Sequence, residues 1–355
     1  MYKKIFLLCC LVAILGFNFS CRKEKKLLDR VSIRKKDLKR IKKSENFTNL
    51  FTLQNKYILY LEFGLGNIIS LKINNKYIGL LARGNYTSVY IFNKQNGKFI
   101  GKAGDRGKGP GDFLSISDFL FLSKNKILTY DIVLNRFNIY KIESKKIKHL
   151  KSFLLMYESM SGLSQMTFVN NRIYTFNNSN YKGNYKNFIL DKNFKIINKY
   201  DKFKHTSYVA WEPSVLKNDR IYIANEVWHT SSKALSKDPF KNAKCEKSID
   251  VYDLNGNFLR EINSHIEKNY YKTPIYFNKE GSLMLIDKKI IVDINGKLIK
   301  KLKEKKSFKE NEKFYREVEV SYNLDGILKT FIPDRLTKND NTVVIKTYEF
   351  LKDKQ

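Results

Sequence analysis

The segment SDFLFLSKNKILTYDIVLNRFNIYKIESKKIKHLKSF, residues 117–153, contains four short runs of β-branched, aromatic and other apolar residues separated by polar turns. Each run has the usual length of a β-strand, and the residues between the runs are too few for anything but tight connections. The segment therefore predicts one four-stranded antiparallel sheet, with strands at 117–123, 126–132, 136–142 and 146–153.

The second of these strands opens with a pattern that recurs along the chain: polar turn residues followed by an apolar strand. Six copies are spaced 46 to 62 residues apart, an interval that suits four short strands and their turns. The copies are NNKYIGLL near Tyr77, KNKILTYD near Ile127, NNRIYTFN near Ile173, NDRIYIAN near Ile221, EGSLMLID near Leu283 and NDNTVVIK near Val343.

A second pattern follows most copies and predicts a hairpin. Asn-Gly between alternating apolar residues favours a tight turn, because both residues tolerate the positive φ of a primed two-residue turn. The three instances are YIFNKQNGKFIG at 90–101, VYDLNGNFLREI at 251–262 and IVDINGKLIKKL at 291–302, and degenerate versions are FILDKNFKIINK at 188–199 and FNIYKIESKKIKHL at 137–150.

Together the repeats predict an all-β chain, a six-bladed β-propeller of four-stranded antiparallel blades, because radial stacking of sheets leaves only short, protected edges. Helical periodicity is nearly absent outside residues 27–43. The sixth blade is short of strands at the C-terminus. We therefore expect KYILYLEF, residues 56–63, to complete it and close the ring.

The N-terminus predicts export. Lys3 and Lys4 precede an uncharged apolar run that ends before Cys21, and this run is short for a membrane span. A cysteine at that point resembles the lipobox of bacterial lipoproteins, in which the thiol is acylated. Ordinary signal cleavage or an uncleaved anchor remains the alternative, and each places the mature chain outside the cytoplasm, on the periplasmic or surface face of the cell envelope.

The cysteines and these boundaries divide the chain. Cys9 and Cys10 lie in the expected signal peptide, so Cys245 alone remains beside Cys21 and no internal disulfide framework forms. We expect a signal peptide at 1–20, a lipidated basic tether at 21–44 and the propeller at 45–355.

The formal net charge of +32 falls to +30 without residues 1–20, which hold two lysines and no acid. The excess is mainly lysine, spread along the chain without an interleaved aromatic and basic motif, which argues against nucleic-acid binding. Residues 22–43 hold 12 Lys and Arg against 3 Asp and Glu. Beside a lipid anchor this segment would lie on anionic head groups, although a solvated tether remains open for its outer part.

One stretch of the chain resembles the Gly-x-Gly-Pro-Gly-acid-aromatic signature of the six-bladed β-propeller lipoproteins of Bacteroidetes: residues 97–121, GKFIGKAGDRGKGPGDFLSISDFLF. That family is similar to NHL-repeat propellers. The resemblance covers residues 45–351, and Asp112-Phe113 stands where Glu-Tyr is more usual. The resemblance implies the fold and a location in the cell envelope, but no established activity.

The glycine-rich part of that signature matches the spacing of neither a P-loop nor a dinucleotide fingerprint. We interpret residues 104–113 as the connection from the last strand of blade 1 to the first strand of blade 2, in which glycine gives the backbone its freedom. An anion nest is the alternative. The residues of this structural loop are Gly104, Gly107, Gly109, Pro110, Gly111 and Asp112.

In a propeller, the connections between blades share one face with the turns between second and third strands. Rare aromatic and histidine residues fall in such connections around blades 4 and 5, where they could stack on sugars or hold a peptide or protein partner. Packing of a long insertion against the blades is the alternative role. The candidates are His205, Tyr208, Trp211, Trp228, His229, His265, Tyr270 and Tyr271.

An enzyme is the runner-up hypothesis, a metal-dependent hydrolase of the lactonase type, and only this alternative requires a divalent cation. The recurrent acids lie beside turns, where aspartate accepts hydrogen bonds from backbone N–H groups. A zinc site from three histidines and Cys245 has no supporting ligand spacing, so we predict no metal or cofactor. These acids are Asp131, Asp191, Asp253 and Asp293, and the histidines are His205, His229 and His265.

Overall fold

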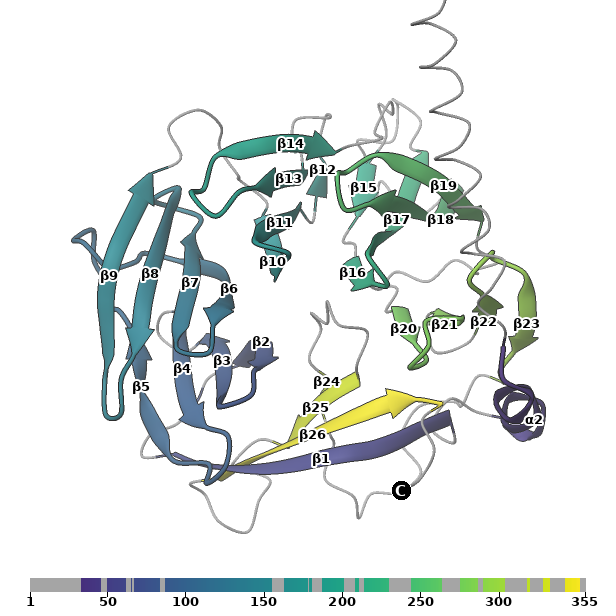
Figure 1. Cartoon of the computed structure of the whole chain (residues 1–355), viewed down its shortest axis with the longest axis horizontal. Coiled ribbons are helices and arrows are strands. Elements are labelled where there is room, and N and C mark those ends of the chain that lie inside the picture. The colour runs from purple at the N-terminus through teal and green to yellow at the C-terminus, as the bar shows by residue number, and fades with distance from the viewer. Residues whose placement is uncertain are drawn as a thin grey trace, which may run out of the picture.

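Six antiparallel sheets form a ring in the computed structural model of the chain (Figure 1). The sheets are blades that pack face to face around a central axis, and their innermost strands are β2, β6, β10, β16, β20 and β24. The structure describes residues 33–45, 50–61, 65, 67–83, 87–154, 163–177, 179–180, 187–200, 208–210, 214–229, 244–263, 275–286, 290–303, 318–319, 328–332 and 342–351.

The first three blades follow one another along the chain, and each has four strands. Blade 1 comprises β2 (Asn67–Ile73), β3 (Tyr77–Arg83), β4 (Thr87–Asn93) and β5 (Phe99–Ala103). Blade 2 comprises β6 (Ile116–Ser123), β7 (Lys126–Asp131), β8 (Arg136–Ile142) and β9 (Ile147–Leu154). Blade 3 comprises β10 (Leu163–Val169), β11 (Arg172–Asn177), β13 (Asn187–Leu190) and β14 (Ile196–Tyr200).

The second half of the ring differs in blade 4, whose sheet has six strands where we expected four. Blade 4 comprises β12 (Ser179–Asn180), β15 (Tyr208–Ala210), β16 (Ser214–Lys217), β17 (Arg220–His229), β18 (Lys244–Asp253) and β19 (Phe258–Asn263). Blade 5 comprises β20 (Ile275–Phe277), β21 (Leu283–Ile286), β22 (Ile290–Asp293) and β23 (Leu298–Lys301). Blade 6 comprises β24 (Val318–Glu319), β25 (Leu328–Ile332), β26 (Thr342–Phe350) and β1 (Phe51–Tyr60).

The ring closes as the sequence predicts, because the N-terminal β1 supplies the outermost strand of blade 6. It pairs antiparallel with β26, from Phe51 opposite Phe350 to Tyr60 opposite Thr342. The sixth copy of the repeat therefore lies on the third strand of its blade, whereas the first five lie on second strands.

The hairpins with Asn-Gly differ from the primed two-residue turns that we expected. Gly97, Gly256 and Gly296 have positive φ, whereas the asparagine before each does not. Asp253 shows why, because its Oδ1 accepts hydrogen bonds from the N–H groups of Asn255 and Asn257, both at 2.8 Å. The register shifts in each pair of strands, which is the pattern of a three-residue loop with a glycine bulge.

The core consists of six apolar clusters, one for each interface between neighbouring blades. The strand β3 shows how a blade serves two of them: Ile78 and Leu80 face blade 6, while Tyr77 and Leu81 face blade 2. Residues buried on both faces of a sheet need no polar alternation. Gly79 in the same strand leaves room for the ring of Phe119, which would lie 2.5 Å from an added Cβ.

The helix α2 (Lys35–Lys43) lies at the rim of the ring, beside blades 5 and 6 (Figure 1). Its Ile41 is fully buried in the cluster that these two blades form. No helix within the described ranges has both the length and the apolar composition that crossing a membrane requires.

Candidate functional site

Blade 4 brings part of the predicted aromatic site together. Its β15 pairs with the far end of β17, so that Tyr208 lies directly opposite Trp228. On the other side of β17, Trp228 lies opposite Cys245 and His229 opposite Lys244. Three neighbouring strands therefore carry two of the aromatic candidates and Cys245 at adjacent positions.

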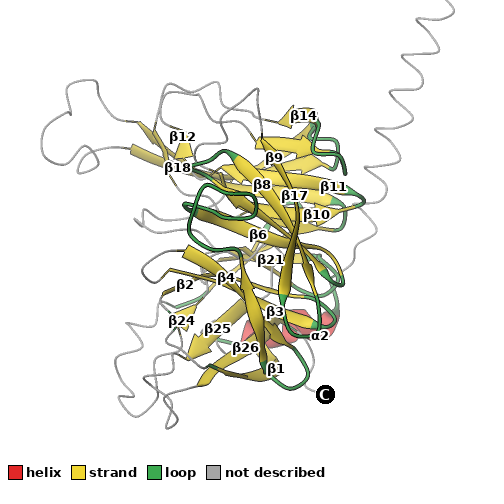
Figure 2. Ribbon diagram, turned by 90° about the vertical axis from the view of Figure 1, so that its left-hand side faces the viewer, coloured by secondary structure: helices red, strands yellow, loops and turns green. Residues whose placement is uncertain are grey.

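These residues lie in strands and not in the connections where we expected them. The strands β17 and β18 have ten residues each and extend beyond the length of an ordinary blade strand, and β12 and β15 add to this extension. Figure 2 shows β12 and β18 projecting at one face of the ring. His205, Trp211, His265, Tyr270 and Tyr271 lie outside the described residues.

The wall of the central channel holds a polar contact that sequence reasoning missed. Lys72 of β2 donates hydrogen bonds to Asp118 Oδ2 of β6 at 2.6 Å and to the carbonyl oxygen of Met166 in β10 at 2.8 Å. The N–H of Met166 donates to the same carboxylate oxygen at 2.7 Å. One ion pair thus joins the innermost strands of three consecutive blades.

Burial makes the loss of either partner of this ion pair costly. Asp118 is 1% exposed, and burial raises the pKa of its carboxyl, against the opposing effects of Lys72 and of the backbone N–H groups. Among the described residues, its buried Oδ1 has no hydrogen-bond partner, nor has either amide atom of Gln165, the neighbour of Met166. A pair of this kind contributes little over an apolar substitute, but removing one partner leaves an uncompensated buried charge.

The glycine-rich loop connects β5 to β6, as the sequence predicts, and its carbonyl groups are directed at blade 2. Arg136 donates to the carbonyl oxygens of Lys108, Gly109 and Asp112, at 3.1, 3.0 and 2.6 Å. Tyr140 donates to the carbonyl oxygen of Gly111 at 2.7 Å, and burial raises its pKa.

Three N–H groups of the loop donate to carbonyl oxygens within the loop. Gly107 donates to the carbonyl oxygen of Phe113, Phe113 to that of Asp105, and Asp112 to that of Gly109. An anion nest needs N–H groups that converge on a ligand, whereas this loop directs carbonyl oxygens at an arginine. These contacts support the structural interpretation of the loop.

The recurrent aspartates form turns, as expected. Asp191, Asp253 and Asp293 each accept two backbone N–H groups of their own hairpin through Oδ1, at 2.8 to 2.9 Å. Asp131 is fully buried and accepts from Leu114 N at 2.6 Å and from Val133 N at 2.9 Å. Within the described ranges, no three His, Cys, Asp or Glu residues are grouped as metal ligands would be.

Comparison with known families agrees with this architecture. The model of a family described as "6-bladed beta-propeller" matches residues 60–238, half of the chain. The chain belongs to this six-bladed β-propeller family. The matched residues begin at the end of β1 and extend past β17, so they include the glycine-rich loop and the first half of the ring.

The solved structures that match this chain include three of low sequence identity. A protein of Bacteroides fragilis described as exported has a TM-score of 0.45 and 14% identity, over 86% of this chain and 97% of that one. The WD40 domain of Toxoplasma gondii coronin has 0.42 and 10%, over 86% and 89%. Hydrazine synthase of Kuenenia stuttgartiensis has 0.44 and 8%, over 62% of each chain. No curated protein matches the chain.

Proposed function

We propose that this chain is an envelope lipoprotein, anchored through Cys21, whose propeller is a binding or scaffold module for a glycan, a peptide or a protein partner. The resemblance of residues 97–121 to the propeller lipoproteins of Bacteroidetes supports the address, as does the apolar run that ends before Cys21.

The observation that carries the binding role is the extension of blade 4. In its strand pairing, Tyr208 lies opposite Trp228 near the end of β17, which is longer than an ordinary blade strand. Aromatic residues dominate the energetic centres of binding surfaces, because they bury large areas with few rotatable bonds. In propeller topology, the turn between the second and third strands of a blade lies on the same face of the ring as the connections between blades, such as the glycine-rich loop. A ligand bound at the extension of blade 4 would therefore be accessible from that face.

The proposed lipid anchor predicts that a fatty-acid probe fed to growing cells labels the protein at Cys21. Cys21→Ala should abolish the labelling and release the protein from the membrane fraction, because the thiol is the acylation site. Cys245→Ala serves as the matched control and should keep both label and membrane association. A wild-type protein that takes up no label would refute the lipid anchor.

The binding role predicts that Trp228→Ala weakens binding by about 1 to 3 kcal/mol, the loss expected when an aromatic anchor is truncated. The measurement is a screen of the purified protein against immobilised oligosaccharides and peptides, followed by titration of the best binder. Tyr60→Ala is the control, since Tyr60 is 53% exposed on β1 of blade 6. Equal losses from both variants would show that blade 4 is not the site.

A further inference from the structure

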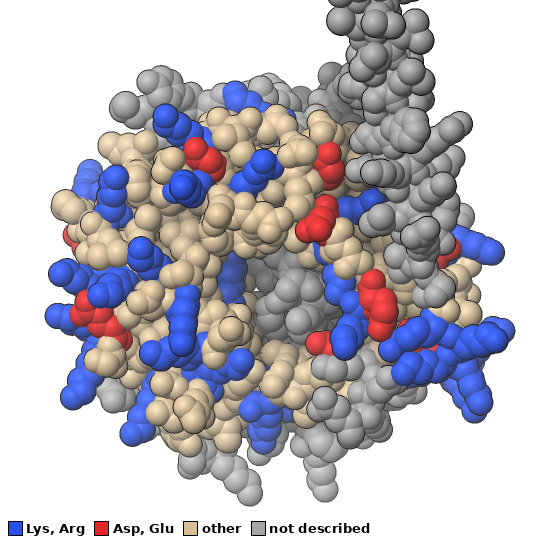
Figure 3. Space-filling model, viewed as in Figure 1, with Lys and Arg blue, Asp and Glu red and all other residues tan. Residues whose placement is uncertain are grey.

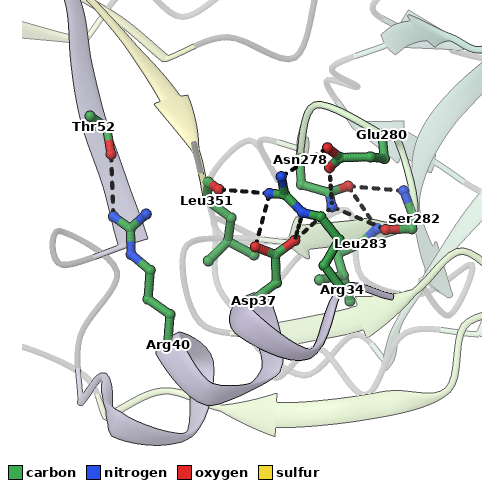
Figure 4. A network of polar contacts seen from close by, with 9 residues as sticks. All are labelled: Arg34, Asp37, Arg40, Thr52, Asn278, Glu280, Ser282, Leu283 and Leu351. Atoms are coloured by element: carbon green, nitrogen blue, oxygen red, sulfur yellow. Dashed lines mark hydrogen bonds and ion pairs between the residues drawn. The ribbon is translucent and has the colours of Figure 1, made fainter. Parts of the chain in front are cut away.

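The helix α2 is fixed to the propeller at its N-terminal end by buried polar contacts (Figure 4). Arg34 forms two hydrogen bonds with the carboxylate of Asp37, both at 2.9 Å, and an ion pair with Glu280 at 3.1 Å. It also donates to the carbonyl oxygen of Leu351, beyond the end of β26. Asp37 is 2% exposed, and Asn278, at 0%, donates to it.

The C-terminal end of the helix is fixed as well. Lys300 of β23 donates to three acceptors in the last turn, the carbonyl oxygens of Ile41, Lys42 and Ser44, at 2.6 to 3.0 Å. A cation at this position also interacts favourably with the helix dipole. With Ile41 buried between blades 5 and 6, the helix is part of the rigid body and not a hanging tether.

The exposed side of α2 is strongly basic. Five lysines are exposed, and at 100° per residue they fall within an arc of about 120°, opposite the buried Asp37 and Ile41. Asp37, the helix's acid in its first turn, is thus turned away from this face. Figure 3 shows the basic side chains gathered at the rim where Figure 1 places the helix. These lysines are Lys35, Lys36, Lys39, Lys42 and Lys43.

The length of the chain between Cys21 and the helix limits how far this face can lie from a lipid anchor. Cys21 precedes Ile33, the first described residue, by twelve residues, which span at most about 40 Å when fully extended. If Cys21 carries lipid, this linker keeps the N-terminal end of the helix within about 40 Å of the bilayer surface. A lysine near an anionic lipid surface gains about fivefold in affinity, so the group has a substantial combined effect.

We propose that the exposed face of α2 docks on anionic lipid head groups and holds the propeller with its rim, at blades 5 and 6, against the membrane. The helix is seen nearly end-on at the rim in Figure 1, and its buried Asp37 and Ile41 face the propeller, so the lysines on the opposite side face outward from the rim. This inference deepens the proposed function and rests on it for the location at a membrane. The docking surface itself consists only of residues that the structure describes.

The test uses the purified chain of residues 22–355, which contains every residue that the structure describes and no lipid anchor. Binding to vesicles of phosphatidylglycerol mixed with phosphatidylcholine should weaken at least about 100-fold in a variant with Lys35, Lys39, Lys42 and Lys43 changed to Gln. The control changes Lys145, Lys148, Lys192 and Lys195 to Gln, four exposed lysines on blades 2 and 3, and should weaken binding only a few-fold.

A second measurement reads the orientation. On a Cys245→Ser background, a fluorophore at Lys301→Cys of β23 should be quenched by nitroxide-labelled lipids, and one at Lys148→Cys of β9 should not. Asp37→Ala keeps the lysines but removes the buried partner of Arg34, so binding should persist while the difference between the two fluorophores becomes smaller, since Lys300 and Ile41 still hold the helix.

Equal losses from the two lysine variants would show that overall charge attracts the protein, and equal quenching would show that no face is preferred. Each result would overturn the docking surface. Because this protein lacks Cys21, neither result depends on acylation, whereas missing fatty-acid label with intact vesicle docking would refute only the lipid anchor.

Discussion

Asp118→Ala should lower the free energy of unfolding by about 3 to 5 kcal/mol, measured by urea denaturation at neutral pH. The substitution leaves the Lys72 ammonium, whose side chain is 18% exposed, without its carboxylate. It also leaves the N–H of Met166 without the acceptor at 2.7 Å. Neither group can recover full hydration at the channel wall, so both costs appear in the folded state.

A surface ion pair provides the control for this prediction. Lys102 and Asp105 are also in ion-pair contact, but Asp105 is 72% exposed, so Asp105→Ala should cost less than about 1 kcal/mol. The double variant Lys72→Met, Asp118→Leu should recover part of the loss, because it replaces the whole buried ion pair with apolar side chains. If Asp118→Ala and Asp105→Ala are equally stable, the contact between three blades contributes nothing.

The ring could be predicted from local sequence because each blade repeats the same local signals. The strand β7 of blade 2, with Ile127, follows a turn of two residues, and the aspartates of the hairpins mark where strands end. Even the closing strand could be predicted, because a propeller with a short last blade must borrow one. These inferences depend on residues close together in the chain.

The channel contact and the docked helix could not be predicted in this way. Lys72, Asp118 and Met166 lie on three different blades, and their meeting depends on the curvature of the whole ring. The helix resembled a basic tether, because a single Asp37 among many lysines gives no sign that it is buried. Its partners, Asn278 and Glu280, are more than 200 residues away.

The degenerate hairpin predicted at 188–199 is present, and one residue explains why its pattern differs from the others. Phe194 has a positive φ of 65°, in the position that glycine occupies in the other hairpins, and a bulky residue there is strained. Its ring packs 4.5 Å from that of Phe153 and 5.6 Å from that of Phe137. The burial of the ring offsets the strain, which explains why the hairpin at 188–199 looked degenerate.

Gly104→Ala should destabilise the fold by about 2 to 5 kcal/mol, whereas Gly109→Ala in the same loop should change stability by less than about 1 kcal/mol. Gly104 has a φ of 65°, and an added Cβ would lie 2.2 Å from the carbonyl oxygen of Gly111. That oxygen is held by the Tyr140 hydroxyl, so it cannot move away without breaking a buried hydrogen bond.

Gly109 has neither constraint. Its φ is not positive, and the nearest atom to an added Cβ is the Asp112 carboxylate oxygen, at 2.9 Å, the end of a side chain that can rotate. The sequence shows both glycines in one signature but not which of them requires the left-handed backbone. Thermal unfolding of the two variants distinguishes them. Equal melting temperatures would mean that the loop can relax around residue 104, and that its hydrogen bonds to blade 2 do not fix its conformation.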